Sequence, residues 1–419
     1  MTSWTEHAIW WHVYPLGFTG AERVALRPGA APRHRLRHLA GWLDYAVELG
    51  CSGLLLGPVF AAETHGYDTV DHFRIDRRLG DDADFAALAA AADERGLRIV
   101  LDGVFNHVAR SFPHPEWFRR DPGGGFATFE GHRQLIALDH SLPAVADYVG
   151  EVMSYWLDRG VAGWRLDAAY AVPAAFWRQV LPKVRTSYPD AWFGAEMIHG
   201  DYAEYATAAG LDSVTQYELW KAIWSSLNDQ NFFELAWALD RHGQFSADGL
   251  LLQTFTGNHD VTRLASQLTD SRHLAHALVV LCTVAGLPSI YYGDEQAFRG
   301  VKENRAGGDD EIRPSFPLSP LGLAAEGWPV YRLHQRLIGF RRRHPWLVRG
   351  RLHVEHLANE AFAYRCSGPD GSGSVVVLLN VSDAPYRFEV DLGALTVADA
   401  SEPAADPLLV PPHGWTILA

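Results

Sequence analysis

Short apolar runs that alternate with segments of helical length constrain the fold of this 419-residue chain more than any other feature. Helix patterns at 36–49 and 82–95, each stopped by a glycine, lie between the first three runs. Strands that alternate with helices form parallel sheets, and eight such strands favour a closed (β/α)8 barrel over an open sheet. The eight predicted strands lie at residues 9–14, 54–56, 97–101, 163–166, 192–195, 213–216, 251–256 and 289–292.

Two regions interrupt this alternation and predict additional parts. Residues 108–141 follow the third strand, contain several Pro and Gly residues and show no clear helix, which indicates a short excursion from the barrel, a domain B. Beyond about residue 347 the pattern changes to alternating strands, such as 374–380, separated by turn residues. We therefore predict a barrel domain at 1–107 and 142–347, domain B at 108–141, and a C-terminal antiparallel β-sandwich domain at 348–419.

The charge and cysteine content exclude several classes of protein. The chain carries 36 Lys and Arg against 50 Asp and Glu, a formal net charge of -14, which disfavours a nucleic-acid partner. No apolar stretch approaches membrane-spanning length, and the first residues lack the basic and apolar regions of a signal peptide. Cys51, Cys282 and Cys366 fit neither a disulfide framework nor a zinc pattern, so we expect buried thiols. We expect a cytoplasmic protein without membrane or nucleic-acid partners; the sequence does not address its oligomeric state.

Ionisable side chains gather at four of the predicted strand ends, which is where (β/α)8 barrels place their active sites. Arg165 and Asp167 are two residues apart on the fourth strand, so both leave the same face of it, toward the barrel axis. A neighbouring Arg keeps a carboxylate ionised, as a carboxylate nucleophile requires. The other strand-end candidates are Asp102, Asn106 and His107 after the third strand, Glu196 after the fifth, and His259 and Asp260 after the seventh.

Three carboxylates from three strand ends, together with an Arg and two His, fit the cleavage of a glycosidic bond. One carboxylate attacks the anomeric carbon, and a second, kept protonated by its surroundings, donates a proton to the leaving oxygen. A metal site is the alternative for acidic residues beside His, but Arg165 would oppose a bound cation. The sequence contains no P-loop, Rossmann fingerprint, nucleophile elbow or helical zinc motif.

Six segments resemble conserved stretches of the α-amylase family, glycoside hydrolase family 13, and the resemblance covers nearly the whole chain. Each short motif alone would be a weak signal, but all of them follow one another in the right order, each at its own strand end. They are GYD at 66–68 with Asp71, DGVFNH at 102–107, GWRLDA at 163–168, GAE at 194–196, GNHD at 257–260 and GLPSIYYGDE at 286–295. The resemblance implies a (β/α)8 barrel and a glycoside hydrolase that retains anomeric configuration.

The resemblance also assigns a role to each candidate residue. It makes Asp167 the nucleophile, Glu196 the general acid/base and Asp260 the carboxylate that stabilises the transition state. Retention of configuration implies about 5 Å between the nucleophile and the acid/base. Residues implied to hold the sugar or the nucleophile are Tyr67, His107, Arg165 and His259.

Structural interpretations differ in strength among these residues. Three unpaired carboxylates at one barrel mouth would destabilise the fold, which argues against a purely structural role for the catalytic three. Asp102 supports the site in the family, but a simple hydrogen bond to Arg165 would also explain it. Asn106 is a calcium ligand in many members and fits a structural hydrogen bond equally well.

Departures from the family pattern reduce the range of substrates that we expect. Endo-acting members continue the second block with a Lys-His pair that contacts sugars on the leaving-group side, whereas here Asp167 is followed by Ala168, Ala169 and Tyr170. Many exo-acting α-glucosidases carry an Asp where this chain has Thr64. Neither a starch-degrading endo-amylase nor a simple α-glucosidase is therefore expected.

Asp309 and Arg313 resemble a pair found in neopullulanase-like and cyclodextrin-degrading members, which are also the nearest in motif at 102–107. The N-terminal domain of those members is not expected here, because the first predicted strand begins near residue 8. We assign Asp309 and Arg313 to substrate binding. The sequence thus predicts a hydrolase that cleaves α-1,4 and α-1,6 bonds in malto-oligosaccharides or related α-glucans.

Two other functions stay open. A transglycosylase or disaccharide isomerase, of the glucanotransferase or trehalose synthase type, would use the same covalent intermediate with another acceptor. A non-catalytic sugar-binding barrel is disfavoured, because all three catalytic carboxylates are present. No cofactor is predicted: domain B is short, the calcium-binding motif of its longer versions is not apparent, and we expect activity to survive chelation.

Overall fold

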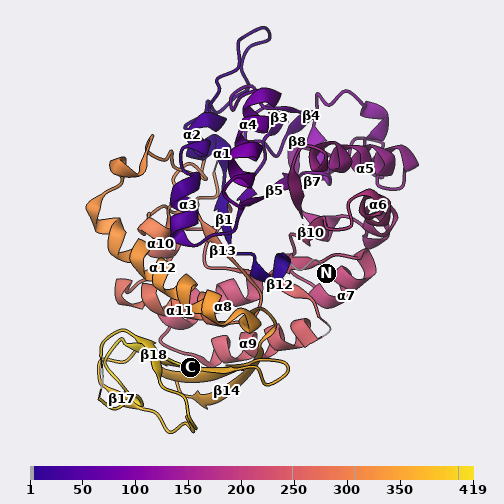
Figure 1. The fold of residues 1–419 in the computed structure, drawn as a ribbon. Coiled ribbons are helices and arrows are strands. Elements are labelled where there is room, and N and C mark those ends of the chain that lie inside the picture. Colours follow the sequence, from indigo (N-terminus) through magenta and orange to yellow (C-terminus); the bar gives the residue numbers. More distant parts are fainter. Residues whose placement is uncertain (1–3, 248, 306, 404) are drawn as a thin grey trace. The chain divides into compact units, whose positions relative to one another are not determined.

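The computed structural model describes residues 4–247, 249–305, 307–403 and 405–419, and it contains a closed barrel of eight parallel strands (Figure 1). Neighbouring strands follow the order β1-β13-β12-β11-β10-β9-β5-β2 around the barrel. Each of these strands overlaps one predicted from the sequence, so the predicted barrel is confirmed. Their bounds are β1 (Trp10–Val13), β2 (Gly53–Leu56), β5 (Arg98–Gly103), β9 (Val161–Leu166), β10 (Trp192–Ala195), β11 (Ser213–Thr215), β12 (Leu251–Phe255) and β13 (Leu287–Tyr291).

The chain folds as two compact units, each of which is described by itself. The first unit comprises Met1–Thr5, Ile9–Thr215 and Arg313–Ala324 and holds β1 to β11. The second unit comprises Glu6–Ala8, Gln216–Ile312 and Ala325–Ala419 and holds β12, β13 and the C-terminal strands. The domain boundaries expected after residues 107, 141 and 347 stay predictions.

Helices follow the strands of the first unit. The stretch predicted as one helix after β1 is two helices, α2 (Leu36–Ala40) and α3 (Leu43–Leu49), interrupted at Gly41. The predicted alanine-rich helix is α4 (Asp82–Asp93), which begins at a capping box formed by the side chain of Asp81. Later helices of this unit are α5 (Pro143–Leu157), α6 (Ala174–Ser187) and α7 (Tyr202–Ala209).

The register of β9 between β5 and β10 positions the residues of the site. Asp102 of β5 pairs with Arg165 of β9, and Gly194 of β10 lies on the other side of Arg165. Alternation along β9 places the fully buried Trp164 on the face opposite Arg165. Asp102 and Arg165 therefore leave neighbouring strands at the same level.

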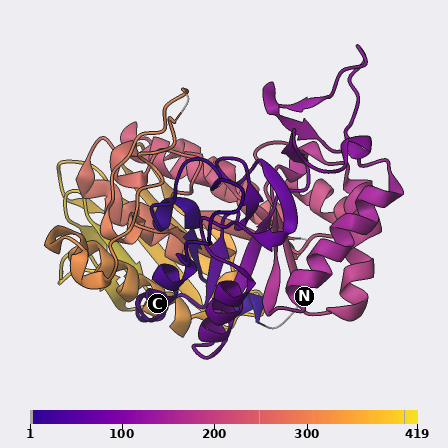
Figure 2. The ribbon, with the colours of Figure 1, turned by 90° about the horizontal axis from the view of Figure 1, so that it is seen from above.

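The segment after β5 forms a small sheet of its own. β6 (His107–Ala109), β8 (His132–Ala137) and β7 (Thr128–Phe129) pair antiparallel in that order. In Figure 2 this purple segment extends away from the strands of its own unit. A second hairpin, which the sequence did not predict, joins β3 (Phe60–Ala62) to β4 (Thr69–Ile75) and carries Tyr67 in its loop.

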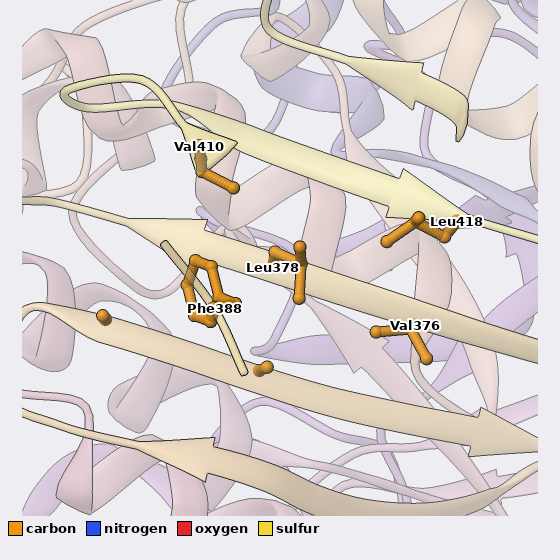
Figure 3. Close-up of a cluster of buried hydrophobic side chains, with 7 residues drawn as sticks. Val376, Leu378, Phe388, Val410 and Leu418 are labelled. Carbon is orange, nitrogen blue, oxygen red and sulfur yellow. The ribbon is translucent and has the colours of Figure 1, made fainter. Parts of the chain in front are cut away.

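The C-terminal part of the second unit is antiparallel β structure, as predicted. A five-stranded sheet has the order β14-β15-β16-β20-β18, and β17 pairs with β19. Val376 and Leu378, two residues apart on β16, pack with Phe388, Val410 and Leu418 in a buried core (Figure 3). The strand bounds are β14 (Arg351–Leu357), β15 (Ala361–Ser367), β16 (Ser374–Asn380), β17 (Tyr386–Arg387), β18 (Val397–Ala400), β19 (Leu409–Val410) and β20 (Trp415–Leu418). The longer helices of this unit are α8 (Tyr217–Asn228), α9 (Phe233–Ala247), α11 (Leu274–Thr283) and α12 (Trp328–Arg343).

Two expectations drawn from composition can be compared with the structure. In the part of the chain that the structure describes, no helix is long and apolar enough to span a membrane. All three cysteines are buried, as expected. Burial raises the pKa of Cys282 and of Cys366 to about 12, so both are thiols at neutral pH.

Candidate active site

Arg165 is the centre of a buried ion-pair cluster in the first unit. Its Nη1 donates to both carboxylate oxygens of Asp102, each at 2.7 Å, and to Oδ1 of Asp167 at 3.2 Å. Its Nη2 donates to Oε1 of Glu196 at 2.6 Å. One guanidinium thus binds three carboxylates: Asp102 at the end of β5, Asp167 after β9 and Glu196 after β10. Arg165 and these three residues were all predicted from the sequence.

The charges of this cluster do not balance. All four residues are buried, with at most 6% of any of them exposed. Burial alone would lower the pKa of Arg165, but Asp102 and Glu196 raise it well above its usual value, so the guanidinium stays charged. Three carboxylates around one cation leave excess negative charge. That sign is the one that stabilises the oxocarbenium-like transition state of glycoside cleavage.

A backbone turn after β9 holds Glu196. The N–H of Ala168 donates to Oε2 of Glu196 at 2.9 Å, and the N–H of Glu196 donates to the Leu166 carbonyl at 2.9 Å. Ala168 has a φ of 46°, in the left-handed region that residues other than Gly rarely adopt. No sequence signal predicts this turn, and it points a backbone donor at the proposed acid/base.

Aromatic rings and hydrogen bonds fix the other predicted residues of the first unit. The Tyr67 hydroxyl donates to Oδ2 of Asp102 at 3.0 Å, so Asp102 accepts from both Tyr67 and Arg165. His107 stacks on Phe129, with ring centroids 4.5 Å apart and planes inclined by 10°. The amide nitrogen of Asn106 lies 3.1 Å from Nδ1 of His107.

The hydrogen bond from Asn106 determines the tautomer of His107. Burial lowers the pKa of His107 to about 3, so the ring is neutral near pH 7. An amide NH₂ only donates, so Nδ1 of His107 accepts and its Nε2 carries the hydrogen. A neutral imidazole with a hydrogen on Nε2 can donate to a sugar hydroxyl.

Tyr170, the third residue after Asp167, contacts the excursion after β5. Its hydroxyl donates to Oε1 of Glu130 at 2.7 Å, and its ring lies 6.4 Å from Phe129 and 5.3 Å from His199. Burial, followed by the hydrogen bond that Tyr170 donates to Glu130, raises the pKa of Tyr170, which therefore stays protonated. Phe129 and Glu130 were not predicted as site residues, because only the paired strands of the excursion bring them to Tyr170.

In the second unit, two further predicted residues lie together. Nε2 of His259, which is fully buried, lies 2.9 Å from Oδ2 of Asp260, whose side chain is 32% exposed. The backbone N–H of Asp260 donates to Oδ1 of Asn258 at 2.8 Å, and the Asn258 amide donates to the Tyr217 hydroxyl at 2.8 Å. Asn258 therefore positions Asp260, a role that the sequence analysis did not assign.

Asp294 lies directly behind the chain that leads to Asp260. A Cβ at Gly257 would lie 2.2 Å from Oδ2 of Asp294, so a larger residue there would displace this carboxylate. Oδ1 of Asp294 accepts from Nη1 of Arg263 at 2.8 Å. Burial raises the pKa of Asp294 to about 6, and the neighbouring Arg263 opposes that rise only in part.

Replacing Asp294 by Asn should make folding less sensitive to pH. The pKa of the folded wild type lies near 6 against an ordinary 3.8, so between about pH 4 and pH 6 the folded state retains a proton that the unfolded state releases. Wild-type stability therefore falls as pH rises through this window, by about 3 kcal/mol. Asn keeps the acceptor for Arg263 without a charge, so the stability of the variant relative to wild type should rise between pH 4 and pH 7.

Urea unfolding at pH 4.5 and pH 7 measures this difference, with Asp147→Asn as the control, because Asp147 is an exposed carboxylate paired with Lys183 at 3.0 Å. Equal losses of stability in the Asp294→Asn variant at both pH values would contradict the argument.

Asp309 and Arg313, predicted as a substrate-binding pair, have separate local contacts. Oδ1 of Asp309 lies 3.5 Å from Nζ of Lys302 in the second unit, where both side chains are partly exposed. In the first unit the guanidinium of Arg313 lies 4.6 Å from the ring centre of Tyr14. Tyr14, directly after β1, was not among the predicted residues. A role of Asp309 and Arg313 in sugar binding stays a prediction.

Comparison with known proteins decides the family. The model of the alpha amylase catalytic domain matches residues 34–123 and 126–351, which is most of the chain. The chain belongs to the alpha-amylase family. Its relatives include the cyclomaltodextrinase of Geobacillus thermopakistaniensis, 26% identical over 99% of this chain and 77% of that protein. Neopullulanase 2 of Thermoactinomyces vulgaris is 28% identical over 86% of this chain and 67% of its own length.

A solved structure gives the same result. The cyclic alpha-maltosyl-(1→6)-maltose hydrolase of Arthrobacter globiformis is 25% identical and matches with a TM-score of 0.82 over 100% of both chains. These relatives are named as glycoside hydrolases of the amylase type. The chain is a glycoside hydrolase of this family, as predicted from its strand-end residues.

Proposed function

We propose that this enzyme hydrolyses α-glucosidic bonds in malto-oligosaccharides or related α-glucans by double displacement, with retention of configuration. The observation that carries this proposal is the binding of Asp167 and Glu196 to adjacent nitrogens of the Arg165 guanidinium. Retaining glycosidases need two carboxyl groups at close range, one a nucleophile and one an acid/base. Arg165 supplies that spacing.

In the proposed first step Asp167 attacks the anomeric carbon and forms a covalent glycosyl ester, while Glu196 transfers its proton to the leaving oxygen. Both oxygens of Glu196 accept hydrogen bonds in the structure, from Arg165 and from the N–H of Ala168, so Glu196 must take up a proton before this step. Ester formation removes the charge of Asp167. The positive charge of Arg165 is then balanced by one carboxylate fewer, so it stabilises the ionised form of Glu196 more strongly. Ionised Glu196 is the base that activates water in the second step.

The remaining predicted residues bind the sugar in this proposal. Tyr67 offers a ring beside Asp102, and Nε2–H of His107 donates to a hydroxyl. In the second unit His259 holds the carboxylate of Asp260, to which we assign stabilisation of the transition state. The relatives named cyclomaltodextrinase, neopullulanase and cyclic maltosyl-maltose hydrolase support short or branched α-glucans as substrates, with both α-1,4 and α-1,6 bonds.

A substrate panel tests this function. Purified enzyme is given maltotriose, a cyclodextrin, pullulan, isomaltose and sucrose, and the first product is followed by NMR. We expect cleavage of the malto-oligosaccharides and the α-anomer as the first product, because two displacements restore configuration. Cleavage of sucrose alone would overturn the substrate class, and a β-anomer as the first product would overturn the mechanism.

Replacing Tyr170 by Ala should weaken interactions on the leaving-group side. The Tyr170 ring and its contact with Glu130 occupy the place of the family's Lys-His pair, so we expect about a 3- to 10-fold loss in kcat/KM for maltotriose, the worth of one aromatic contact. An aryl α-maltoside, whose leaving group needs no sugar contact there, should lose less. Product analysis at high maltose concentration separates hydrolysis from the alternative transglycosylase or isomerase. In that assay the variant should form fewer transfer products than wild type. Equal effects on both substrates would contradict this placement of Tyr170.

We propose that catalysis needs no calcium. Asn106, a calcium ligand in many members of the family, presents its amide nitrogen to His107 and so serves the imidazole here. Activity on maltotriose at 25 °C should survive dialysis against a chelator within about twofold, in line with the absence of any metal step in double displacement. Loss of activity that calcium alone restores would defeat this prediction.

We also propose that the enzyme works in the cytoplasm. Its three cysteines are buried side chains, as is common in reducing compartments, where disulfide frameworks are rare. Fractionation of producing cells, with the enzyme detected by antibody, measures the location directly.

A further inference from the structure

A pair of histidines joins two separate segments of the second unit. His273 follows α10 (Leu264–Gln267) and directly precedes α11, whereas His413 lies in the turn between β19 and β20. Nε2 of His273 lies 3.0 Å from Nδ1 of His413. His273 is buried, and the side chain of His413 is only 6% exposed. The carboxylate of Asp270 completes a group whose ligand atoms all lie within 4.8 Å of one another.

The hydrogen bonds around this pair aim a lone pair of His413 at His273. Nε2 of His413 lies 2.8 Å from Oδ1 of Asp383, which only accepts, so this nitrogen carries the hydrogen of the ring. Nδ1 of His413 therefore presents a lone pair to Nε2 of His273 at 3.0 Å. The carboxylate of Asp270 lies in the same group, so two nitrogens and one carboxylate oxygen converge at one point. A cation at this point can replace the hydrogen that the two rings share.

We propose that Asp270, His273 and His413 bind a divalent transition metal ion of the zinc class. Two imidazoles and one carboxylate are a donor set that suits zinc, and a water molecule would take the fourth position. Two nitrogens bonded to one tetrahedral zinc lie about 3.3 Å apart, so the pair needs to open by only a few tenths of an ångström. No described residue of the catalytic cluster takes part in this group.

Neighbouring residues hold the ligands in place, as outer contacts do at metal sites. Asp383 fixes the tautomer of His413 through Nε2. Nε2 of His276, one turn beyond His273, lies 2.9 Å from the carbonyl of Gly414 and 3.1 Å from that of Asn380. These contacts hold Gly414, the residue after His413, beside the end of β16, and His413 itself has a left-handed φ of 49°. The turn is therefore held in the conformation that aims Nδ1 at His273.

Arg272 carries a positive charge beside the group and opposes the ion. Its guanidinium binds Asp270, and this contact holds the pKa of Asp270 well below its usual range, so the carboxylate is charged. The side chain of Arg272 is 57% exposed and can turn into solvent when a cation takes its place. Replacing Arg272 by Gln should therefore tighten metal binding.

The proposed ion would have a structural role. It would tie the segment before α11 to the turn before β20, so it should stabilise the attachment of the C-terminal sheet within the second unit. Binding to the folded state alone raises the melting temperature.

The test is titration of the chelator-treated, full-length enzyme with Zn²⁺ alone, by calorimetry and by thermal melting. His413→Gly removes a ligand and relieves the left-handed backbone. His34→Gly is the matched control, because His34 also has a φ of 49° and lies in the other His and Asp group, with Asp81 and Asp84. We expect one Zn²⁺ per chain and a higher melting temperature for wild type and for His34→Gly.

For His413→Gly we expect at least about a 100-fold weaker affinity and no thermal shift, and for Asp383→Asn about a 10-fold weaker affinity. Asp270→Asn, which keeps an acceptor for the backbone N–H of Arg272, should also weaken binding if the first variant folds poorly. No binding to wild type would mean that the two rings share a proton only, and it would overturn the proposal. Binding that His34→Gly abolishes, or that His413→Gly leaves unchanged, would overturn it as well.

Discussion

Replacing Asp167 by Asn should lower kcat for malto-oligosaccharides by about 10⁴-fold or more, the order of loss when a group central to the chemistry is removed. The amide keeps the shape of the side chain but cannot form the glycosyl ester. The melting temperature should stay at or above the wild-type value. Asp167 is one of three carboxylates around Arg165, so the substitution removes a like charge from a buried, negatively charged cluster.

The nucleophile can be separated from a positioning role with a small anion. In Asp167→Ala, azide should enter the vacated space and restore turnover of an activated aryl α-maltoside, and the product should be the β-configured azide, since only one displacement then occurs. Asp147→Asn serves as the control for charge removal at an exposed site. Turnover near wild type in Asp167→Asn, or rescue that yields an α-configured azide, would be incompatible with the assigned role.

The residues at the strand ends could be predicted because strand periodicity fixes their direction. Arg165 and Asp167 are two apart on a buried strand, so the sequence alone predicts that they share a face, and they lie 3.2 Å apart. The contact of Asp102 with Arg165 follows from the strand order of a barrel, which sets β5 beside β9. Both contacts depend on the regular geometry of β-strands, which the pattern of apolar residues in a sequence predicts.

Other parts of the site depend on irregular backbone and could not be predicted. The N–H of Ala168 reaches Glu196 because the backbone of Ala168 adopts the left-handed conformation. Alanine rarely adopts this conformation, so the sequence does not predict it. Tyr170 meets Glu130 only through the pairing of the excursion strands, 40 residues away in the chain. The first predicted helix is likewise two helices that are interrupted at Gly41. The helical spacing of the apolar residues continues across this interruption, so the sequence did not indicate it.

Replacing Arg165 by Met should cost on the order of 3–5 kcal/mol of unfolding free energy as well as nearly all activity. The substitution leaves Asp102, Asp167 and Glu196 buried together without their shared cation. In this respect it is the opposite of Asp167→Asn, which removes one excess charge and leaves the cation. The two variants together therefore distinguish loss of chemistry from loss of the cluster that supports it.

The stability deficit of Arg165→Met should exceed that of a variant that loses a cation at the surface. Without the shared guanidinium, the three buried carboxylates repel one another in the folded state. Urea unfolding measures the deficit, with Arg159→Met as the control, because the Arg159 guanidinium is exposed and lies over the Tyr155 ring.

Adding Asp102→Asn to Arg165→Met should recover part of the lost stability, because one of the unpaired charges is then absent. A double-mutant cycle gives this coupling, which should be favourable and at least about 1 kcal/mol for two residues in direct contact. The same addition should not restore activity, since Asp167 and Glu196 still lack the guanidinium that spaces them. A deficit no larger than that of Arg159→Met, or a coupling near zero, would mean that Arg165 contributes packing rather than charge, and the electrostatic account of the site would fail with it.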